Sequence, residues 1–377
     1  MTLVGGGTVL AAVGGGGGFV ATRTPRDALA PWTRAGGPAY ADPRLNALSY
    51  AILAPNPHNR QPWLVALQGD DALVVHFDET RQLPHTDPFD RQLTIGLGCF
   101  LELMRMAASA QGMAVDLALF PEGSAPGGLD GRPVAHARFR HDAAAAPDPL
   151  WHFVTARRST KTPYDTARPV TLEALRRILA VAGSGASAGG SVADVDIAYW
   201  RELTERALMV EIETPRTWHE SVDLFRIGKR EINANPDGIA LSGPMIEVLN
   251  MAGLFTRTAA RDRTSLAYEQ SVNDAVESCR TAMGHLWLVT PGNSRAEQVA
   301  AGADWLRINL AATREGLGVH PYSQALQEYP EMEAARREAH ARLAPDGGTV
   351  QMLARVGYAE PVPPTPRWPI ETRLVTA

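Results

Sequence analysis

The sequence predicts an α+β fold made of two related halves in one chain. A helix, a polar turn, strands and a glycine-containing helix come first, followed by a helix, a polar turn, a strand, a long helix and a last strand. The 377 residues exceed the roughly 100 to 200 of one typical domain. We expect the first half to span residues 42–145 and the second 150–377, after an N-terminal segment 1–41.

Composition excludes several classes of protein. With 45% hydrophobic and 20% charged residues, the chain is neither a disordered acidic protein nor a polytopic membrane protein. The 36 basic and 41 acidic residues give a net charge of −5, so no bulk positive field favours nucleic acid. Cys99 and Cys279 lack CxxC spacing, and we expect neither a disulfide framework nor a metal site.

The N-terminal segment is uncharged and apolar over residues 1–21, and too rich in glycine for a stable helix. It is similar to the core of a signal peptide, such as a twin-arginine export signal, although the positive residues that precede such a core are missing. One interpretation is an exported periplasmic or membrane-tethered envelope protein. The alternative is an apolar tail on a cytoplasmic protein. Pro25 and Pro31 predict an extended arm over residues 22–37.

In the first half, Asp42 and Pro43 have the residue types of an N-cap and a first helical position, so a helix is expected from there to Pro55. The turn 54–63, APNPHNRQPW, follows it. Apolar runs then predict a hairpin of strands over 64–67 and 73–77. A helical period over 91–111 contains Gly96 and Gly98, which predicts close packing.

In the second half, a polar RRSTK turn at residues 157–161 lies between two expected helices. The expected helices cover residues 149–156, 171–181, 200–213, 218–233, 246–255 and 297–315, and the expected strands cover 284–290 and 352–358. The glycine-rich stretch 184–191 predicts a flexible loop. Residues from about 200 to 263 match no motif, and we expect them to form a helical lid over a substrate pocket.

Four segments resemble motifs of the FMN-dependent nitroreductases. The turn 54–63 resembles the APSxxNxQPW turn of that family, and RRSTK resembles its RRSxR start. Gly316-Leu317-Gly318 resembles the flavin loop that follows a long helix. The segment 355–358 and the pair Pro366-Arg367 resemble the C-terminal phosphate-binding tail.

The order of these motifs is similar to that of one branch of the superfamily. In ordinary members the arginine motif precedes the asparagine turn, whereas here it follows about a hundred residues later. This order resembles the fused, Acg-like branch, in which one chain folds as a pseudo-dimer. The resemblance implies a monomer with one FMN per chain, because each half retains only one of the two motifs.

The chemistry of the motif residues suits FMN. Guanidinium groups bind phosphate with two N–H groups at once, while amides suit the polar edge of the ring. The resemblance therefore implies a phosphate and ribityl group of Arg157, Arg158, Ser159, Lys161 and Arg367. It implies a second group, around the ring, of Pro55, Asn56, His58, Asn59, Gln61, Gly316, Leu317 and Gly318.

Two functions remain open at the level of sequence. The first is an oxidoreductase that transfers two electrons from FMN to a nitroaromatic, a quinone or a similar small acceptor, with NADH or NADPH as a candidate donor. The second is a flavin store or stress protein with a covered, weakly reactive FMN. Flavin carries the chemistry itself, so no catalytic side chain is required. His58 could act as a general acid, but a hydrogen-bonding role within its turn is the preferred interpretation.

Overall fold

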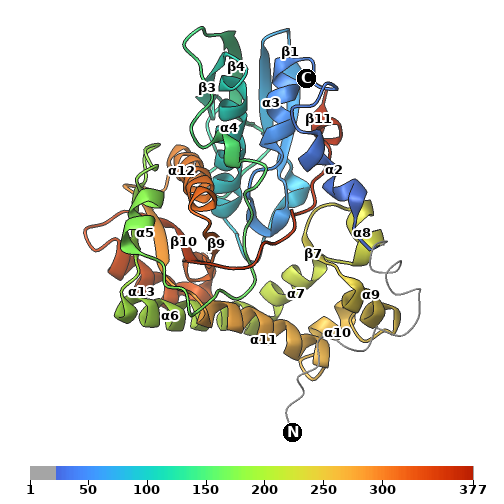
Figure 1. The fold of residues 1–377 in the computed structure, drawn as a ribbon, viewed down its shortest axis with the longest axis vertical. Helices are drawn as coiled ribbons and strands as arrows, with labels where there is room; N and C mark the ends of the chain where they lie inside the picture. Colours follow the sequence, from blue (N-terminus) through green and yellow to red (C-terminus); the bar gives the residue numbers. More distant parts are fainter. Residues whose placement is uncertain (1–22, 377) are drawn as a thin grey trace.

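The computed structural model describes residues 23–376, and its first half contains one five-stranded sheet (Figure 1). Along the chain come α3 (Pro43–Ala51), β1 (Trp63–Gln68), β2 (Ala72–Phe77), α4 (Arg91–Ser109), β3 (Met113–Leu119) and β4 (Pro133–His141). The strand order is β11-β1-β2-β4-β3. The expected helix at Pro43, the hairpin and the long helix are confirmed, whereas the β3–β4 pair had not been predicted.

The second half repeats this arrangement around a four-stranded sheet. Its elements are α5 (Leu172–Leu179), β5 (Ser187–Ser191), β8 (His285–Thr290), α12 (Arg295–Arg314), β9 (Gly318–Pro321) and β10 (Thr349–Gly357). The order β5-β8-β10-β9 matches β1-β2-β4-β3 strand for strand. Each half thus runs helix, strand, strand, long helix, strand, strand, which confirms a mixed α+β fold of two related halves.

The two long helices α4 and α12 pack against each other between the sheets (Figure 1). A side chain on Gly98 would collide with the carbonyl of Val299, and one on Gly302 would collide with the carbonyl of Ile95. Each glycine thus meets the carbonyl that lies three residues before the other. This reciprocal contact is the one that a twofold axis generates, so the halves are related by a pseudo-twofold axis between the two glycines.

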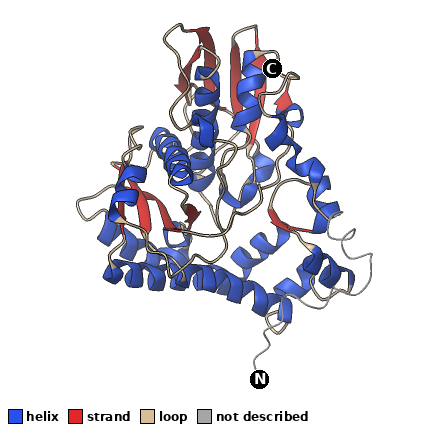
Figure 2. Cartoon of the chain, in the orientation of Figure 1, coloured by secondary structure: helices blue, strands red, loops and turns tan. Residues whose placement is uncertain are grey.

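A long helical insert separates β5 from β8, where the first half has only a hairpin. It contains α6 (Asp194–Glu213), α7 (Pro215–Asp223), β6 (Phe225–Ile227), α8 (Gly228–Ala234), β7 (Ile239–Leu241), α9 (Pro244–Met251), α10 (Arg257–Arg261) and α11 (Leu266–Arg280). Its helices form the base of the molecule in Figure 2. A single helix over 218–233 was wrong, because β6 pairs with β7 in the middle of that stretch. Another helix, α13 (Glu333–Leu343), lies between β9 and β10.

Two expectations about irregular segments were also wrong. The arm at 22–37 contains the helix α2 (Arg26–Arg34), whose Ala28, Pro31 and Trp32 are buried, so packing outweighs the proline that lies inside it. The expected loop 184–191 contains β5, which pairs with β8. Side chains on Gly189 and Gly190 would meet the Trp287 ring and Leu175, so these glycines permit close packing. The signal-like segment 1–21 lies outside the described residues.

The C-terminal tail returns to the first half. Its last strand, β11 (Leu374–Val375), pairs in parallel with β1 and extends the first sheet. The tail also contacts α2, because the Trp32 indole donates to the Thr365 carbonyl at 2.7 Å and the Arg367 amide donates to the Ala28 carbonyl at 2.9 Å. The helix α2 and the tail residue Arg367 therefore lie together, and Arg367 contacts the carbonyls of Leu53 and Ala54 at the start of the turn that follows α3.

Candidate functional site

The turn between α3 and β1 has a strained backbone. His58, Asn59 and Gln61 have φ angles of 47°, 53° and 51°. Left-handed backbone costs a residue other than glycine about 1 to 3 kcal/mol, so three such residues within four positions need strong support. Part of that support is α4, where a side chain on Gly96 would lie 3.0 Å from Asn56. Strain concentrated in this way is common at functional sites.

The amides of Asn56 and Gln61 hold this turn together. The side-chain carbonyl of Asn56 accepts from the backbone N–H of Gln61 at 2.7 Å. The side-chain NH₂ group of Asn56 donates to the backbone carbonyl of Ala54 at 3.1 Å. The buried Gln61 side chain donates to the Pro236 carbonyl at 2.7 Å and accepts from the Trp368 amide at 2.9 Å. Both side chains therefore use their amide groups to support the turn, and a contact of either residue with a cofactor stays a prediction.

Asn59 joins the turn to the C-terminal tail. Its side-chain carbonyl accepts from Arg367 Nη1 at 2.7 Å, and its NH₂ group donates to the Pro366 carbonyl at 3.0 Å. Arg367 Nη2 donates to the carbonyls of Leu53 and Ala54, each at 3.1 Å. Arg367 is 2% exposed, so its charge lies inside the protein. The structure thus uses most donors of Arg367 to fasten the tail, rather than leaving the whole guanidinium open to a phosphate.

The RRSTK turn of the second half meets the asparagine turn of the first. Arg157 Nη2 donates to the Leu53 carbonyl at 3.3 Å, the same carbonyl that Arg367 contacts. Arg158 lies 4.7 Å from the ring centre of Trp32 and donates to the Thr155 carbonyl at 2.8 Å. Segments about a hundred residues apart in sequence are therefore in direct contact, as one shared site requires.

The loop after α12 lies against RRSTK. The Thr160 amide donates to the Val319 carbonyl at 3.1 Å. Gly316 has a φ of 69°, as expected for a glycine that ends a helix, and Leu317 is buried. A side chain on Gly318 would lie 2.9 Å from the Thr160 side chain, so this glycine permits the approach of RRSTK. Pro55 is also buried, at the start of the asparagine turn.

The meeting point carries positive charge that no acidic residue balances. Within the described residues, Arg157, Arg158, Lys161 and Arg367 pair with no carboxylate, and burial lowers the pKa of each, that of Arg157 to about 10. Several buried donors also lack a partner: Arg157 Nη1, Arg158 Nε, Arg367 Nε and Arg355 Nη1. An unmade bond of this kind costs about 1 to 3 kcal/mol. The site therefore has the charge and the free donors to hold an anion.

Lys161 and two histidines line an accessible part of this region. The Lys161 side chain is exposed, and His58 and His320 are partly exposed, yet burial lowers the pKa of all three. These three side chains are thus accessible to a ligand at the place where RRSTK meets the asparagine turn. Burial lowers the pKa of His58 to about 4, so its imidazole is neutral at pH 7 and carries no proton that a general acid would donate from the charged form. Within the described residues, its buried Nδ1 has no hydrogen-bond partner, so the hydrogen bond expected within the turn is not seen.

Sequence reasoning missed His320, and it missed the contacts by which Arg355 supports the RRSTK turn. Arg355 is fully buried and donates to the carbonyls of Thr160 and Thr162 at 3.2 and 2.8 Å, and its guanidinium lies 4.0 Å from the Tyr164 ring centre. Arg355 belongs to a quoted motif, but its contact with RRSTK depends on the pairing of β9 with β10. His320 carries no local signal that distinguishes it from a buried strand residue.

The equivalent place in the second half is closed. The loop between α5 and β5 corresponds to the asparagine turn, and three of its amides donate to the buried carboxylate of Asp304. Gly183 and Ser184 donate to one oxygen at 2.7 and 2.8 Å, and Ala186 donates to the other at 3.1 Å. The carboxylate of Asp304 thus already accepts hydrogen bonds from three amides of this loop.

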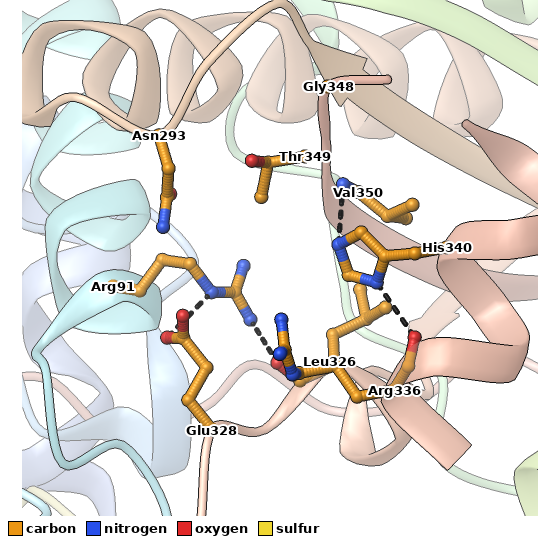
Figure 3. A pocket seen from close by; sticks show the side chains of 9 residues that line it. All are labelled: Arg91, Asn293, Leu326, Glu328, Arg336, His340, Gly348, Thr349 and Val350. Carbon is orange, nitrogen blue, oxygen red and sulfur yellow. Dashed lines mark hydrogen bonds and ion pairs between the residues drawn. The ribbon is translucent and has the colours of Figure 1, made fainter. Parts of the chain in front are cut away.

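A separate cavity beside Arg91 and His340 is part of the packing (Figure 3). Its volume of about 130 Å³ is below the roughly 300 to 1,000 Å³ of small-molecule sites. Arg91 donates to Glu328 at 3.2 Å and to the Leu326 carbonyl at 2.9 Å. His340 donates to the Arg336 carbonyl at 2.8 Å and accepts from the Val350 amide at 3.1 Å. Among the described residues no cluster of His, Cys, Asp and Glu could hold a metal ion.

Comparisons with known proteins give relatives over nearly the whole chain. No family model matches the sequence. The Mycobacterium tuberculosis protein named "Putative NAD(P)H nitroreductase acg" is 26% identical over 352 residues, covering 86% of this chain and 93% of the relative. An uncharacterised protein of the same organism is 26% identical over 347 residues, covering 87% and 92% of the two chains.

Solved structures with a similar fold include two nitroreductases. A "putative nitroreductase" from Anabaena variabilis covers 82% of both chains, with a TM-score of 0.43 and 12% identity. The FMN-dependent NfnB from Mycobacterium smegmatis, in complex with NADPH, covers 54% of this chain and 85% of its own, with a TM-score of 0.32 and 16% identity. The chain is thus similar, along nearly its full length, to a Mycobacterium tuberculosis protein that is named as a putative nitroreductase.

Proposed function

We propose that the protein is an FMN-dependent oxidoreductase that transfers two electrons to a nitroaromatic, a quinone or a similar small acceptor. The observation that carries this proposal is the group of cations where the halves meet, which has unpartnered buried donors and no acidic partner. A phosphate dianion would balance the charge, and the phosphate oxygens with the carbonyl oxygens and nitrogens of a flavin ring would accept from the free donors.

The residues at the junction divide into three roles. Arg157, Arg158 and Ser159 would hold the phosphate. The side chains of Lys161 and His58 are accessible. Together with the loop Gly316–Gly318 they would lie beside the ring. Arg367, Asn59, Asn56 and Gln61 would keep the strained turn and the tail in place. When bound, FMN supplies the hydride-transfer chemistry, and the protein supplies position and electrostatics.

Calorimetry with apoprotein tests the number of sites. We expect one FMN per chain, because the loop equivalent to the asparagine turn is closed by Asp304 in the second half. Two FMN per chain would contradict the single-site proposal.

Replacing Arg158 by alanine should weaken FMN binding by about 10- to 150-fold. Hydrogen bonds to charged groups contribute roughly 1.5 to 3 kcal/mol, and Arg158 Nε has no partner in the protein. The control is Arg105→Ala, which removes an exposed arginine that pairs with Glu102 on α4. If Arg158→Ala binds FMN as tightly as wild type, the phosphate assignment is wrong.

A flavin store is a second candidate, and one contact favours it. The insert reaches the asparagine turn, where the Gly238 amide donates to the Asn59 carbonyl at 3.2 Å and Gln61 contacts Pro236. An insert fixed in this way could cover the flavin. Anaerobic addition of NADH or NADPH should bleach the visible flavin band of an oxidoreductase, and a nitro compound should restore it. Reduction by dithionite alone would favour the store.

Localisation and assembly remain proposals that rest on sequence. We propose an exported or envelope-associated protein, on the basis of the apolar segment 1–21. We propose a monomer, because one chain contains both related halves. Within residues 23–376 the structure contains no helix long and apolar enough to span a membrane. Fractionation that finds the full-length protein only in the cytosol would contradict export. Gel filtration at a dimer's mass would contradict the monomer.

A further inference from the structure

His320 lies beside the RRSTK turn but belongs to none of the predicted motifs. Its strand, β9, contacts RRSTK through the hydrogen bond from the Thr160 amide to the Val319 carbonyl at 3.1 Å. After burial, the charge of Lys161 is among the causes that lower the pKa of both His320 and His58, so Lys161 is near enough to each of them to influence it. His320 also keeps part of its surface accessible.

Arg355 determines which ring nitrogen of His320 carries the proton. Arg355 Nε lies 3.3 Å from His320 Nδ1. A guanidinium can only donate, so Nδ1 is the acceptor, and the proton of the neutral ring is on Nε2. Burial and the charges of Arg355 and Lys161 hold the pKa of His320 well below its usual value, which keeps the ring neutral.

The orientation of His320 is fixed from two sides. Arg355 is itself held by the Thr160 and Thr162 carbonyls and by the Tyr164 ring. On the other side, the His320 ring packs edge-to-face against Tyr322, with ring centres 4.8 Å apart. Tyr322 is fixed in turn, because its hydroxyl donates to the Ala275 carbonyl at 2.8 Å. The imidazole therefore has little freedom to turn its Nε2–H elsewhere.

We propose that His320 is a fixed, neutral hydrogen-bond donor beside the RRSTK turn. Its Nε2–H binds an electron-rich oxygen or nitrogen of the ligand. This inference rests on the proposed function, and the acceptor atom belongs either to the flavin ring or to the small molecule that it reduces. In both cases negative charge develops on the acceptor as electrons arrive. A donor already in place then stabilises the reduced form without reorganising.

Nothing that faces His320 makes it a pH switch. The groups that act on it are Arg355, Lys161 and the phenol of Tyr322, and within residues 23–376 no carboxylate is among the causes of its pKa shift. The donor should therefore persist across the range from about pH 5 to 8, in which an ordinary histidine changes charge.

The first experiment tests the tautomer without any cofactor. Apoprotein with ¹⁵N-labelled histidine, compared with His320→Gln, identifies the imidazole signals of His320 by NMR. We expect the shifts of a neutral ring with its proton on Nε2, unchanged from pH 5 to 8. A ring protonated on Nδ1, or one that titrates in this range, would overturn the inference while leaving FMN binding untouched.

The second experiment compares His320→Phe, which removes the donor, with His320→Gln, which retains an N–H. If the acceptor is on the ring, His320→Phe should weaken FMN binding about 2- to 10-fold and lower the midpoint potential of the bound flavin. If the acceptor is on the substrate, both should stay constant while the KM for menadione or nitrofurazone rises by a similar factor.

The glutamine variant should restore most of whichever quantity changes, and His152→Gln on an exposed histidine is the matched control. Unchanged FMN affinity, potential and KM in His320→Phe would overturn the inference. A protein that binds no FMN at all would instead contradict the proposed function, and the NMR result on the apoprotein would still decide the tautomer.

Discussion

The two halves share one topology but treat the loop after their first helix in opposite ways. In the first half, this loop is a strained turn beside cations without acidic partners. In the second half, the corresponding loop is glycine-rich, and the buried carboxylate of Asp304 holds three of its amides. The comparison teaches that two equivalent positions of one topology can differ in charge: within the described residues, one has cationic donors without an acidic partner, whereas an internal carboxylate bonds the amides of the other.

The largest expected effect comes from breaking the contact that relates the halves. In Gly302→Leu the new side chain would meet the Ile95 carbonyl and the Gly98 backbone, which cannot move aside easily. Overpacking of this kind costs typically 1 to 3 kcal/mol and more against backbone, so we expect a large fall in melting temperature or failure to fold. In the control Gly127→Ala nothing lies within 4 Å of the added carbon, and its melting curve should match wild type. A wild-type curve for Gly302→Leu would contradict the pseudo-twofold packing.

A second prediction concerns the insert, which only the second half has. Burial raises the pKa of Glu211 on α6 to about 7, against 4.5 in an unfolded chain. The folded state therefore binds more protons than the unfolded state between these values, and this group destabilises the protein as pH rises through that window. Glu211→Gln should leave stability nearly unchanged at pH 4 and raise it by up to about 3 kcal/mol at pH 8.

Urea unfolding at both pH values measures this difference. Ser49→Ala on α3 is the matched control, because it removes a buried hydroxyl that does not titrate and takes no part in the pKa shift of Glu211. Its effect on the free energy of unfolding should be equal at the two pH values. An equal effect of Glu211→Gln at both values would show that Glu211 does not carry the pH dependence.

The smallest expected effect tests the closed loop directly. Asp304→Asn removes the charge that holds the amides of Gly183, Ser184 and Ala186, and should cost about 1.5 to 3 kcal/mol of stability at pH 7. It should not create a second flavin site, because no arginine motif of the first half faces this loop in the proposed assignment. Urea unfolding and FMN titration of the same variant measure both outcomes. A second equivalent of bound FMN would show that Asp304 alone closed the site.

Local signals predicted much of the fold but not its irregular parts. Asp42 does cap α3, and the helical period at 91–111 gave α4 to within two residues. The strand β5 was missed because its glycines follow from the neighbours Trp287 and Leu175, which come from distant sequence. The helix α2 was missed because the burial of Trp32 against the tail outweighs its proline.

The candidate site divides in the same way. The motif residues do lie together, because a resemblance carries spatial information that propensity lacks. The orientation of their side chains was beyond the sequence. The sequence indicated polar amides at Asn56 and Gln61, but it could not show that these amides bond a turn amide, an insert carbonyl and a tail amide. His320 acquires its role only where β9 pairs with β10 and brings Arg355 alongside.

The return of the C-terminal tail to the first half has a consequence for biosynthesis. β1 gains its outer neighbour, and the asparagine turn gains Arg367, only when the final residues have been translated. More than 200 residues separate β4 from those partners, which takes roughly 10 to 50 s at ordinary rates of elongation. During that time the nascent first half presents an unpaired strand edge, a surface prone to pairing with other chains. The ribosome-bound intermediate is thus where this architecture most needs a chaperone.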